Sequence, residues 1–202
     1  MGALRLIREP ASGRDGMLDS MDNRAKLARA QRNHTLVRIV RSLKHADKID
    51  GFIVAVGESW GIIQGTREGG YFDGYSAFRL KDIKKIRKCE SNFAAKFSRT
   101  LPTWPPCSPK GLELDSTVSV VRSMAAVSSL IGIEQEGRLS AIWIGRLKEE
   151  GRKWTWLMEV RPDGSLHEEP SGYKTKQITL VTIDSMYQRA MANVAESSPA
   201  DD

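Results

Sequence analysis

The feature that most constrains the fold of this chain is an internal repeat. Landmarks of residues 34–97 recur in the same order in residues 128–192. In each copy, a helix-forming segment is followed by several short β-branched runs that are separated by Gly-containing turns. Short, evenly spaced strands are typical of a small barrel rather than a parallel sheet. The repeat therefore predicts two units of the same mainly β fold, joined by the segment between them.

Six landmarks define the repeat, and their spacings drift by a few residues in the turns, where insertions are tolerated. Because Trp60 and Trp154 hold the same place in the two copies, both are predicted to face a barrel interior. The paired landmarks are the Leu36 and Leu130 strands, the Gly51 and Ser140 strands, the Trp60 and Trp154 strands, Gly74-Tyr75 and Gly172-Tyr173, Ile83–Ile86 and Ile178–Val181, and the helical pairs Phe93/Phe97 and Tyr187/Met191.

Composition along the chain predicts five segments. The leader contains several Gly and Pro residues, and four prolines stiffen the linker, although Trp104 and Cys107 within it have the character to dock on a unit. Asp115-Ser116 is suited to cap a helix over Thr117–Ser128. The predicted segments are a flexible leader (1–16), a first small β-barrel with an N-terminal helix (17–97), a Pro-rich linker (98–116), a second small β-barrel with an N-terminal helix (117–192) and a disordered tail (193–202).

The net charge of +6 is distributed unevenly. Residues 1–110 contain 21 Lys and Arg against 11 Asp and Glu, a net +10, whereas residues 111–202 contain 10 against 14, a net −4. A basic half suggests an anionic partner. The alternative is that the two halves complement each other, within one chain or between copies.

The sequence offers little for catalysis or for a cofactor. Its two cysteines are too few for a disulfide framework, which predicts a reducing, cytoplasmic location. No phosphate loop, dinucleotide fingerprint or zinc motif is present, and His34, His45 and His167 are predicted to be exposed and without ligand-spaced partners. Cys89 is predicted to be a half-buried structural thiol, and the alternative is that the basic run before it lowers its pKa. We expect a non-enzymatic protein with no catalytic residues, no bound metal, no small-molecule cofactor and no membrane partner.

A basic set around the last predicted strand of the first unit is the candidate nucleic-acid site. Cations near that strand suit phosphates, and neighbouring aromatic side chains suit stacking on bases. The alternative is a lysine-protected edge strand that resists aggregation. The candidate residues are Arg79, Lys81, Lys84, Lys85, Arg87, Lys88, Trp60 and Tyr75.

The second copy also resembles an uncharacterised bacterial family of proteins about one unit long. The motifs that carry this resemblance are Ile144-Gly145-Arg146, Trp156-Leu157-Met158, Pro162-Asp163, Glu168-Glu169-Pro170, the closing strand within Gln177–Asp184, and Tyr187-Gln188-Arg189-Ala190. The first copy resembles related proteins through Asp73-Gly74-Tyr75 and Leu80–Ile83. Both copies are similar in strand layout to Sm-like small barrels, in which a bent five-stranded sheet follows a helix.

The resemblance implies a fold class: mainly β with short helices, as two Sm-like five-stranded β-barrels in tandem. Sm proteins bind RNA through an Asp-x-Asn and an Arg-Gly, and neither stands at Gly57-Glu58-Ser59 or after Leu80. Sm-like barrels often pair edge to edge. We therefore expect an interaction or scaffold protein that binds another protein or itself. The alternative is a nucleic-acid-binding accessory protein that uses the basic half to bind RNA or single-stranded DNA.

Overall fold

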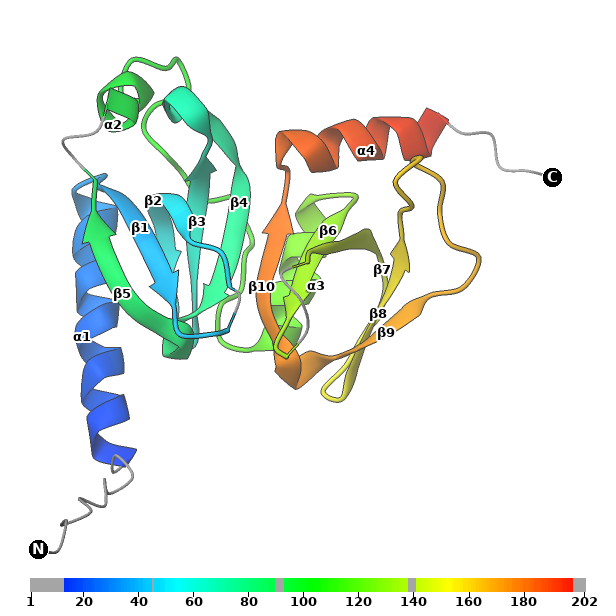
Figure 1. Ribbon diagram of the computed structural model, residues 1–202, viewed down its shortest axis with the longest axis horizontal. Coiled ribbons are helices and arrows are strands. Elements are labelled where there is room, and N and C mark those ends of the chain that lie inside the picture. The colour runs from blue at the N-terminus through cyan, green and yellow to red at the C-terminus, as the bar shows by residue number, and fades with distance from the viewer. Residues whose placement is uncertain (1–12, 45, 90–92, 138–140, 198–202) are drawn as a thin grey trace, which may run out of the picture.

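The computed structural model describes residues 13–44, 46–89, 93–137 and 141–197, and the prediction of a mainly β protein with short helices is confirmed (Figure 1). None of the described helices is long and apolar enough to cross a membrane. The elements are α1 (Gly13–Arg32), β1 (Leu36–Arg41), β2 (Ile49–Val56), β3 (Trp60–Thr66), β4 (Phe72–Arg79), β5 (Ile83–Lys88), α2 (Phe93–Ser98), α3 (Thr117–Val127), β6 (Ile131–Gln135), β7 (Trp143–Glu150), β8 (Trp154–Glu159), β9 (Ser171–Lys174), β10 (Ile178–Ile183) and α4 (Met186–Ser197), with 3-10 helices η1 (Glu68–Gly70), η2 (Leu80–Asp82) and η3 (Thr175–Gln177).

The ten strands form one antiparallel sheet in the order β5-β1-β2-β3-β4-β10-β6-β7-β8-β9. The second five strands repeat the order of the first five, with β6 to β10 in the places of β1 to β5. A helix precedes each set, and a 3-10 helix joins the fourth strand of each set to the fifth. The internal repeat that the sequence predicts is therefore present in the strand order.

Strand register makes the repeat residue-specific. Trp60 pairs with Arg79 across β3 and β4, and Trp154 pairs with Lys174 across β8 and β9. A bulge interrupts β2 at Val54, and β7 has its bulge at the corresponding Lys148. A second matching irregularity occurs where β1 pairs with β5 and where β6 pairs with β10. Bulges of this kind bend a sheet, so both halves bend at corresponding points.

One sequence correspondence was wrong. Register aligns Tyr173 with Phe78 and Gly172 with Ala77, so the Gly172-Tyr173 landmark lies three residues beyond the place of Gly74-Tyr75. The Gly-Tyr pair is easy to recognise in the sequence. The end of the fourth strand of each half, however, is set by the 3-10 helix that follows it.

The two units do not form separate closed barrels, because β4 and β10 pair and join them into one sheet whose outer strands are β5 and β9. Phe78 lies opposite Leu180 in this joint, and Ala77 lies opposite Val181. Every residue of β10 is buried. An apolar strand of this kind must be covered on both faces and at its edge, which explains why the second half pairs with the first.

The helices extend beyond the predicted limits. α1 begins at Gly13, so residues 13–16 are helical rather than part of a flexible leader, and residues 1–12 lie outside the described residues. α4 continues to Ser197, through the first half of the predicted disordered tail. The capping prediction for α3 is confirmed: Ser116 and Ser119 form a reciprocal capping box at its N-terminus.

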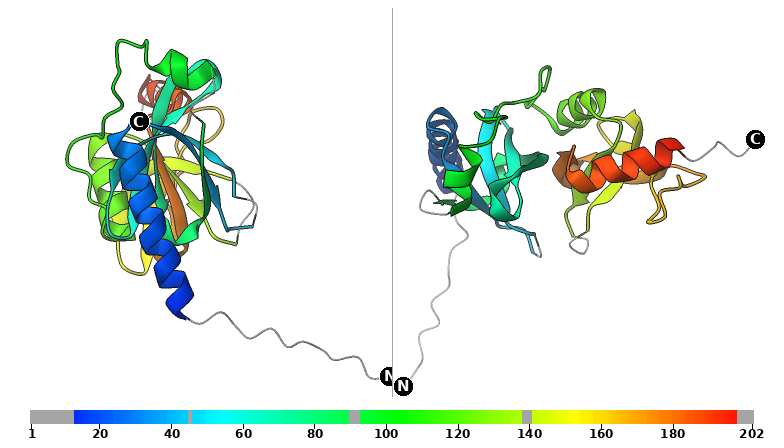
Figure 2. Two further views of the ribbon diagram at one scale, coloured as in Figure 1. Left: turned by 90° about the vertical axis from the view of Figure 1, so that its left-hand side faces the viewer. Right: turned by 90° about the horizontal axis from the view of Figure 1, so that it is seen from above.

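The hydrophobic core crosses the joint between the halves. One cluster of buried side chains contains Trp60 and Ile62 of the first half together with Val120, Ile133 and Val181 of the second. The segment between α2 and α3 runs along one side of the sheet from one half to the other (Figure 2). Its Trp104 is docked as expected, with its ring 5.3 Å from that of Phe52 in an edge-on arrangement. The linker therefore packs on the first half instead of swinging freely.

Candidate functional site

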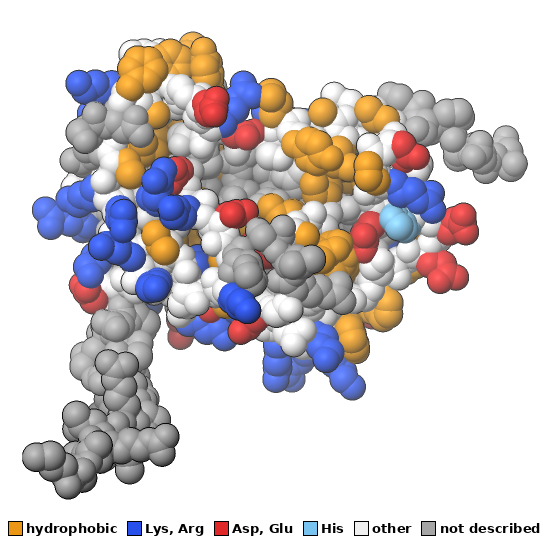
Figure 3. Space-filling view, in the orientation of Figure 1, with side chains coloured by type: hydrophobic (Ala, Val, Ile, Leu, Met, Phe, Trp, Pro, Cys, Tyr) orange, Lys and Arg blue, Asp and Glu red, His pale blue; other side chains and the backbone are white. Residues whose placement is uncertain are grey.

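The basic set on β5 is exposed. Ile83 is buried and Ile86 half-buried toward α1, while the four cations of the strand and Lys81 of η2 face solvent. Figure 3 shows Lys and Arg side chains gathered over this side of the first half. Within the described residues, none of these five cations has an acidic partner within 4.0 Å. The structure thus brings Lys81, Lys84, Lys85, Arg87 and Lys88 together on one outer edge of the sheet.

Of the other three predicted nucleic-acid contacts, Arg79 and Trp60 line a pocket together with Lys81, but their own side chains are buried. Arg79 is buried and paired with Asp82 and, at 3.1 Å, with Glu136. Trp60 is only 2% exposed, because the joint between the halves covers it. Tyr75 is half-buried against the core, and burial raises the pKa of its hydroxyl. The predicted base-stacking role for Trp60 is therefore wrong.

Trp154 is exposed where its counterpart Trp60 is buried. Its exposed fraction is 37%, so the prediction that it lies in a barrel interior is also wrong. Its ring lies 6.1 Å from that of Trp156, two residues along the same face of β8. Trp156 in turn covers Gly172 of β9, where an added Cβ would come within 2.8 Å of the indole. The two rings form an aromatic surface beside the outer strand β9, which we call the Trp154–Trp156 face.

The equivalent positions in the first half show why this face is open. Ile62 and Ala77 stand at the places of Trp156 and Gly172, and both are fully buried in the core cluster that crosses the joint. In the second half, β9 is an outer strand of the sheet, and Trp154 is exposed while Trp156 is half-buried. The sequence contained a signal for this difference: the apolar Val54-Ala55-Val56 of β2 is replaced by Lys148-Glu149-Glu150 in β7.

Two ion pairs also cross the joint, one buried and one with an exposed carboxylate. Arg41 at the end of β1 makes two 2.8 Å hydrogen bonds to the carboxylate of Glu134 on β6, and its side chain is fully buried. Thr179 donates a further hydrogen bond of 2.6 Å to Glu134. Together with Arg79 and Glu136, these contacts pair first-half cations with second-half anions. Part of the charge asymmetry is therefore complemented within the chain.

Histidine and cysteine form no evident reactive centre in the described residues. His34 is half-buried with its ring edge-on to Trp104 at 5.6 Å, which differs from the predicted exposure, whereas His167 is exposed. His45 lies outside the described residues. Cys89 is half-buried as predicted, and burial, followed by the nearby Asp50 carboxylate, raises the pKa of its thiol, which contradicts the alternative of a lowered pKa. No cluster of three His, Cys, Asp or Glu side chains suited to a metal is found among the described residues.

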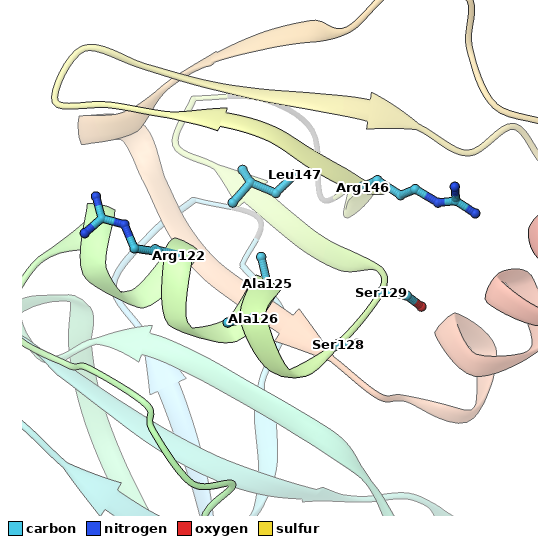
Figure 4. A pocket seen from close by; sticks show the side chains of 7 residues that line it. All are labelled: Arg122, Ala125, Ala126, Ser128, Ser129, Arg146 and Leu147. Carbon is cyan, nitrogen blue, oxygen red and sulfur yellow. The ribbon is translucent and has the colours of Figure 1, made fainter.

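A pocket of about 600 Å³ lies between α3 and β7 (Figure 4). Arg122 and Arg146 stand at its opposite ends, and Leu147 points toward Ala125 between them. The guanidinium groups do not converge, and that of Arg122 is already bound to Glu150 at 2.7 Å. A ligand site normally presents converging polar groups, so this pocket is a poor candidate.

Comparisons of the chain with protein-family models, with curated proteins and with solved structures give no match. Two surfaces of the molecule are therefore the candidates for function: the basic strand at one outer edge of the sheet and the Trp154–Trp156 face at the other.

Proposed function

We propose that this is a non-enzymatic interaction protein that binds another protein, or a second copy of itself, at the outer end of its second half. A single observation carries the proposal. The face around Trp60 and Ile62 is buried in the first half by the second half, whereas the equivalent face of the second half is exposed at Trp154 and half-buried at Trp156. Exposed aromatic side chains on a sheet face are typical of protein interaction sites.

The proposed fold assignment is a tandem of two Sm-like units, here opened and joined into one sheet. It is supported by the repeated strand order, the matching bulges, the helix before each set of strands and the 3-10 helix before each fifth strand. We also place the protein in the cytoplasm, which agrees with two unpaired cysteines.

Site-specific photo-crosslinking in cells tests the proposed function. A photoreactive aromatic residue is introduced in place of Trp154, and as a matched control in place of Tyr187, an exposed aromatic residue of α4. We expect protein adducts, resistant to nuclease, from position 154 and not from position 187. Absence of protein adducts at 154, or adducts of equal yield at both positions, would contradict the proposal.

A second candidate function, nucleic-acid binding, is favoured by one specific observation. The five exposed cations on β5 and η2 lack acidic partners within the described residues, and such a row suits a phosphate backbone. The aromatic partner predicted for them does not accompany them, since Trp60 is buried. This surface would therefore bind phosphates without stacking on bases. Filter binding to single-stranded RNA and DNA at two salt concentrations tests it.

A further inference from the structure

We infer that the Trp154–Trp156 face docks helix α1 of a second copy of this chain, so that copies associate head to tail. This inference rests on the proposed function and names its partner. The joint between the two halves supplies the template, because it shows which elements cover this face when it is buried. In the first half, the equivalent face at Trp60 is covered by the segment before α3 and by α3 itself. Leu114 and Val120 belong to the same cluster of buried residues as Trp60.

Helix α1 is the counterpart of α3. Each helix precedes the first strand of its half. It contacts the second and fifth strands of that half and the 3-10 helix that leads into the fifth strand. Among the residues of α1 whose burial is described (22–32), Leu27 and Ala30 are buried, and they align with the buried Val121 and Met124 of α3. This alignment places Lys26 where α3 has the buried Val120, and the exposed Arg29 where α3 has the buried Ser123.

The residues of α1 that differ from those of α3 are complementary to the Trp154–Trp156 face of a second copy. Where the internal joint packs Val120 in the cluster with Trp60 and Ile62, a second copy would bring Lys26 and Arg29 over Trp154 and Trp156. Cations over indole rings attract through cation–π interactions. The apolar contact within the chain is thus replaced by a cation–aromatic contact between chains.

Charge at the receiving end of the sheet is mixed, because the exposed Arg152 and Lys153 precede Trp154 and the exposed Lys174 pairs with it across β8 and β9, while acidic residues lie on its other sides. The incoming end carries the exposed cations of β5, and the receiving end has Glu149 opposite Trp156, with Glu168 and Glu169 exposed just before β9. If a second copy docked in the way that the second half of the chain packs on the first half, its β5 would lie beside β9 of the receiving copy. The net charges of +10 for residues 1–110 and −4 for residues 111–202 favour this orientation over contacts between like ends.

The same comparison predicts that the contact is weaker than the internal joint. β5 has Lys85, Arg87 and Lys88 where β10 has Leu180, Thr182 and Ile183, and Pro170 precedes the short strand β9. Lysine, proline and short length all hinder a full backbone ladder at an edge. Side chains of α1 and the Trp154–Trp156 face would therefore carry the contact, which makes association reversible and sensitive to salt.

Sedimentation velocity over a range of protein concentrations tests the inference on the full chain. The receiving variant Trp154→Ala/Trp156→Ala and the incoming variant Lys26→Glu/Arg29→Glu should each weaken self-association at least about tenfold. The matched control Lys110→Glu/Arg189→Glu makes the same change in net charge at exposed positions away from both surfaces, and should associate like the wild type. An equimolar mixture of the two weakened variants retains one intact contact, so it should form dimers and no larger species.

Wild-type protein that stays monomeric at every concentration, or association that survives in both variants, would overturn the inference. A monomeric wild type whose position 154 still crosslinks to a different protein would overturn the second-copy partner while leaving the proposed function intact. Loss of RNA binding in the Trp154→Ala/Trp156→Ala variant, without any self-association in the wild type, would assign the face to nucleic acid instead and would also overturn the inference.

Discussion

Trp60 and Trp154 hold equivalent places in the register but differ in environment, and this difference predicts unequal effects of substitution. Trp60→Ala removes a fully packed side chain from the core and should lower the free energy of unfolding by roughly 3–5 kcal/mol. Trp154→Ala removes a side chain that is 37% exposed and should cost about 1 kcal/mol at most. Urea denaturation of the two variants checks both values, and equal destabilisation would contradict the burial described above.

The buried pair of Arg41 and Glu134 predicts a second asymmetry. Glu134→Gln leaves the fully buried Arg41 guanidinium without its counter-charge and should destabilise the protein by roughly 3–5 kcal/mol. The double variant Arg41→Met/Glu134→Leu removes both charges and should be much closer to the wild type in stability. Denaturation midpoints of the three proteins measure the difference. A double variant at least as unstable as Glu134→Gln would show that the pair contributes more than charge compensation.

Strand β5 is the element whose role admits two interpretations. Changing Lys84, Lys85, Arg87 and Lys88 together to Gln leaves its inward residues intact, so the folded protein should keep its stability, since exposed charges contribute little. If the strand guards an edge, the variant should aggregate more readily, as followed by light scattering. We expect this result. If the strand instead binds phosphates, the log–log salt slope of RNA binding should fall by roughly 0.7–0.9 for each phosphate that the variant no longer binds.

A wild-type protein without measurable nucleic-acid affinity at low salt would eliminate the phosphate-binding interpretation. A variant that neither aggregates nor binds RNA more weakly would contradict both interpretations of the strand.

Sequence patterns predicted the elements well because most of them depend on local signals. The β-branched runs, the Ser116 cap and the cationic face of β5 are all readable within a few residues. Edge-to-edge pairing of the two units within the chain was considered, but the strands that pair, β4 and β10, were not predicted, because the choice depends on the contrast between an apolar β10 and a cationic β5 in equivalent places. The environment of Trp154 was missed for the same reason: burial there is decided by a neighbouring unit, not by its own strand.

For the whole molecule, the consequence is that one sheet has two different ends. The first half contributes a basic outer strand and helix, and the second half contributes an aromatic face flanked by residues of both charges. The two halves are joined by the pairing of β4 with β10, by the buried Arg41–Glu134 pair and by the partly exposed Arg79–Glu136 pair. This arrangement holds the two ends apart on a continuous scaffold, which suits a protein that links partners.

Fluorine NMR of protein labelled with 5-fluorotryptophan tests the central claim most directly, because the chain has only five tryptophans and each resonance can be assigned with a single Trp→Phe variant. In dilute protein, the Trp154 resonance should show the largest solvent-isotope shift and the Trp60 resonance almost none. When the partner is added, or the protein is concentrated, the Trp154 and Trp156 resonances should shift or broaden while Trp60 stays unchanged. A Trp154 resonance that is shielded from solvent in dilute protein, or unaffected under conditions where binding is complete, would contradict the account.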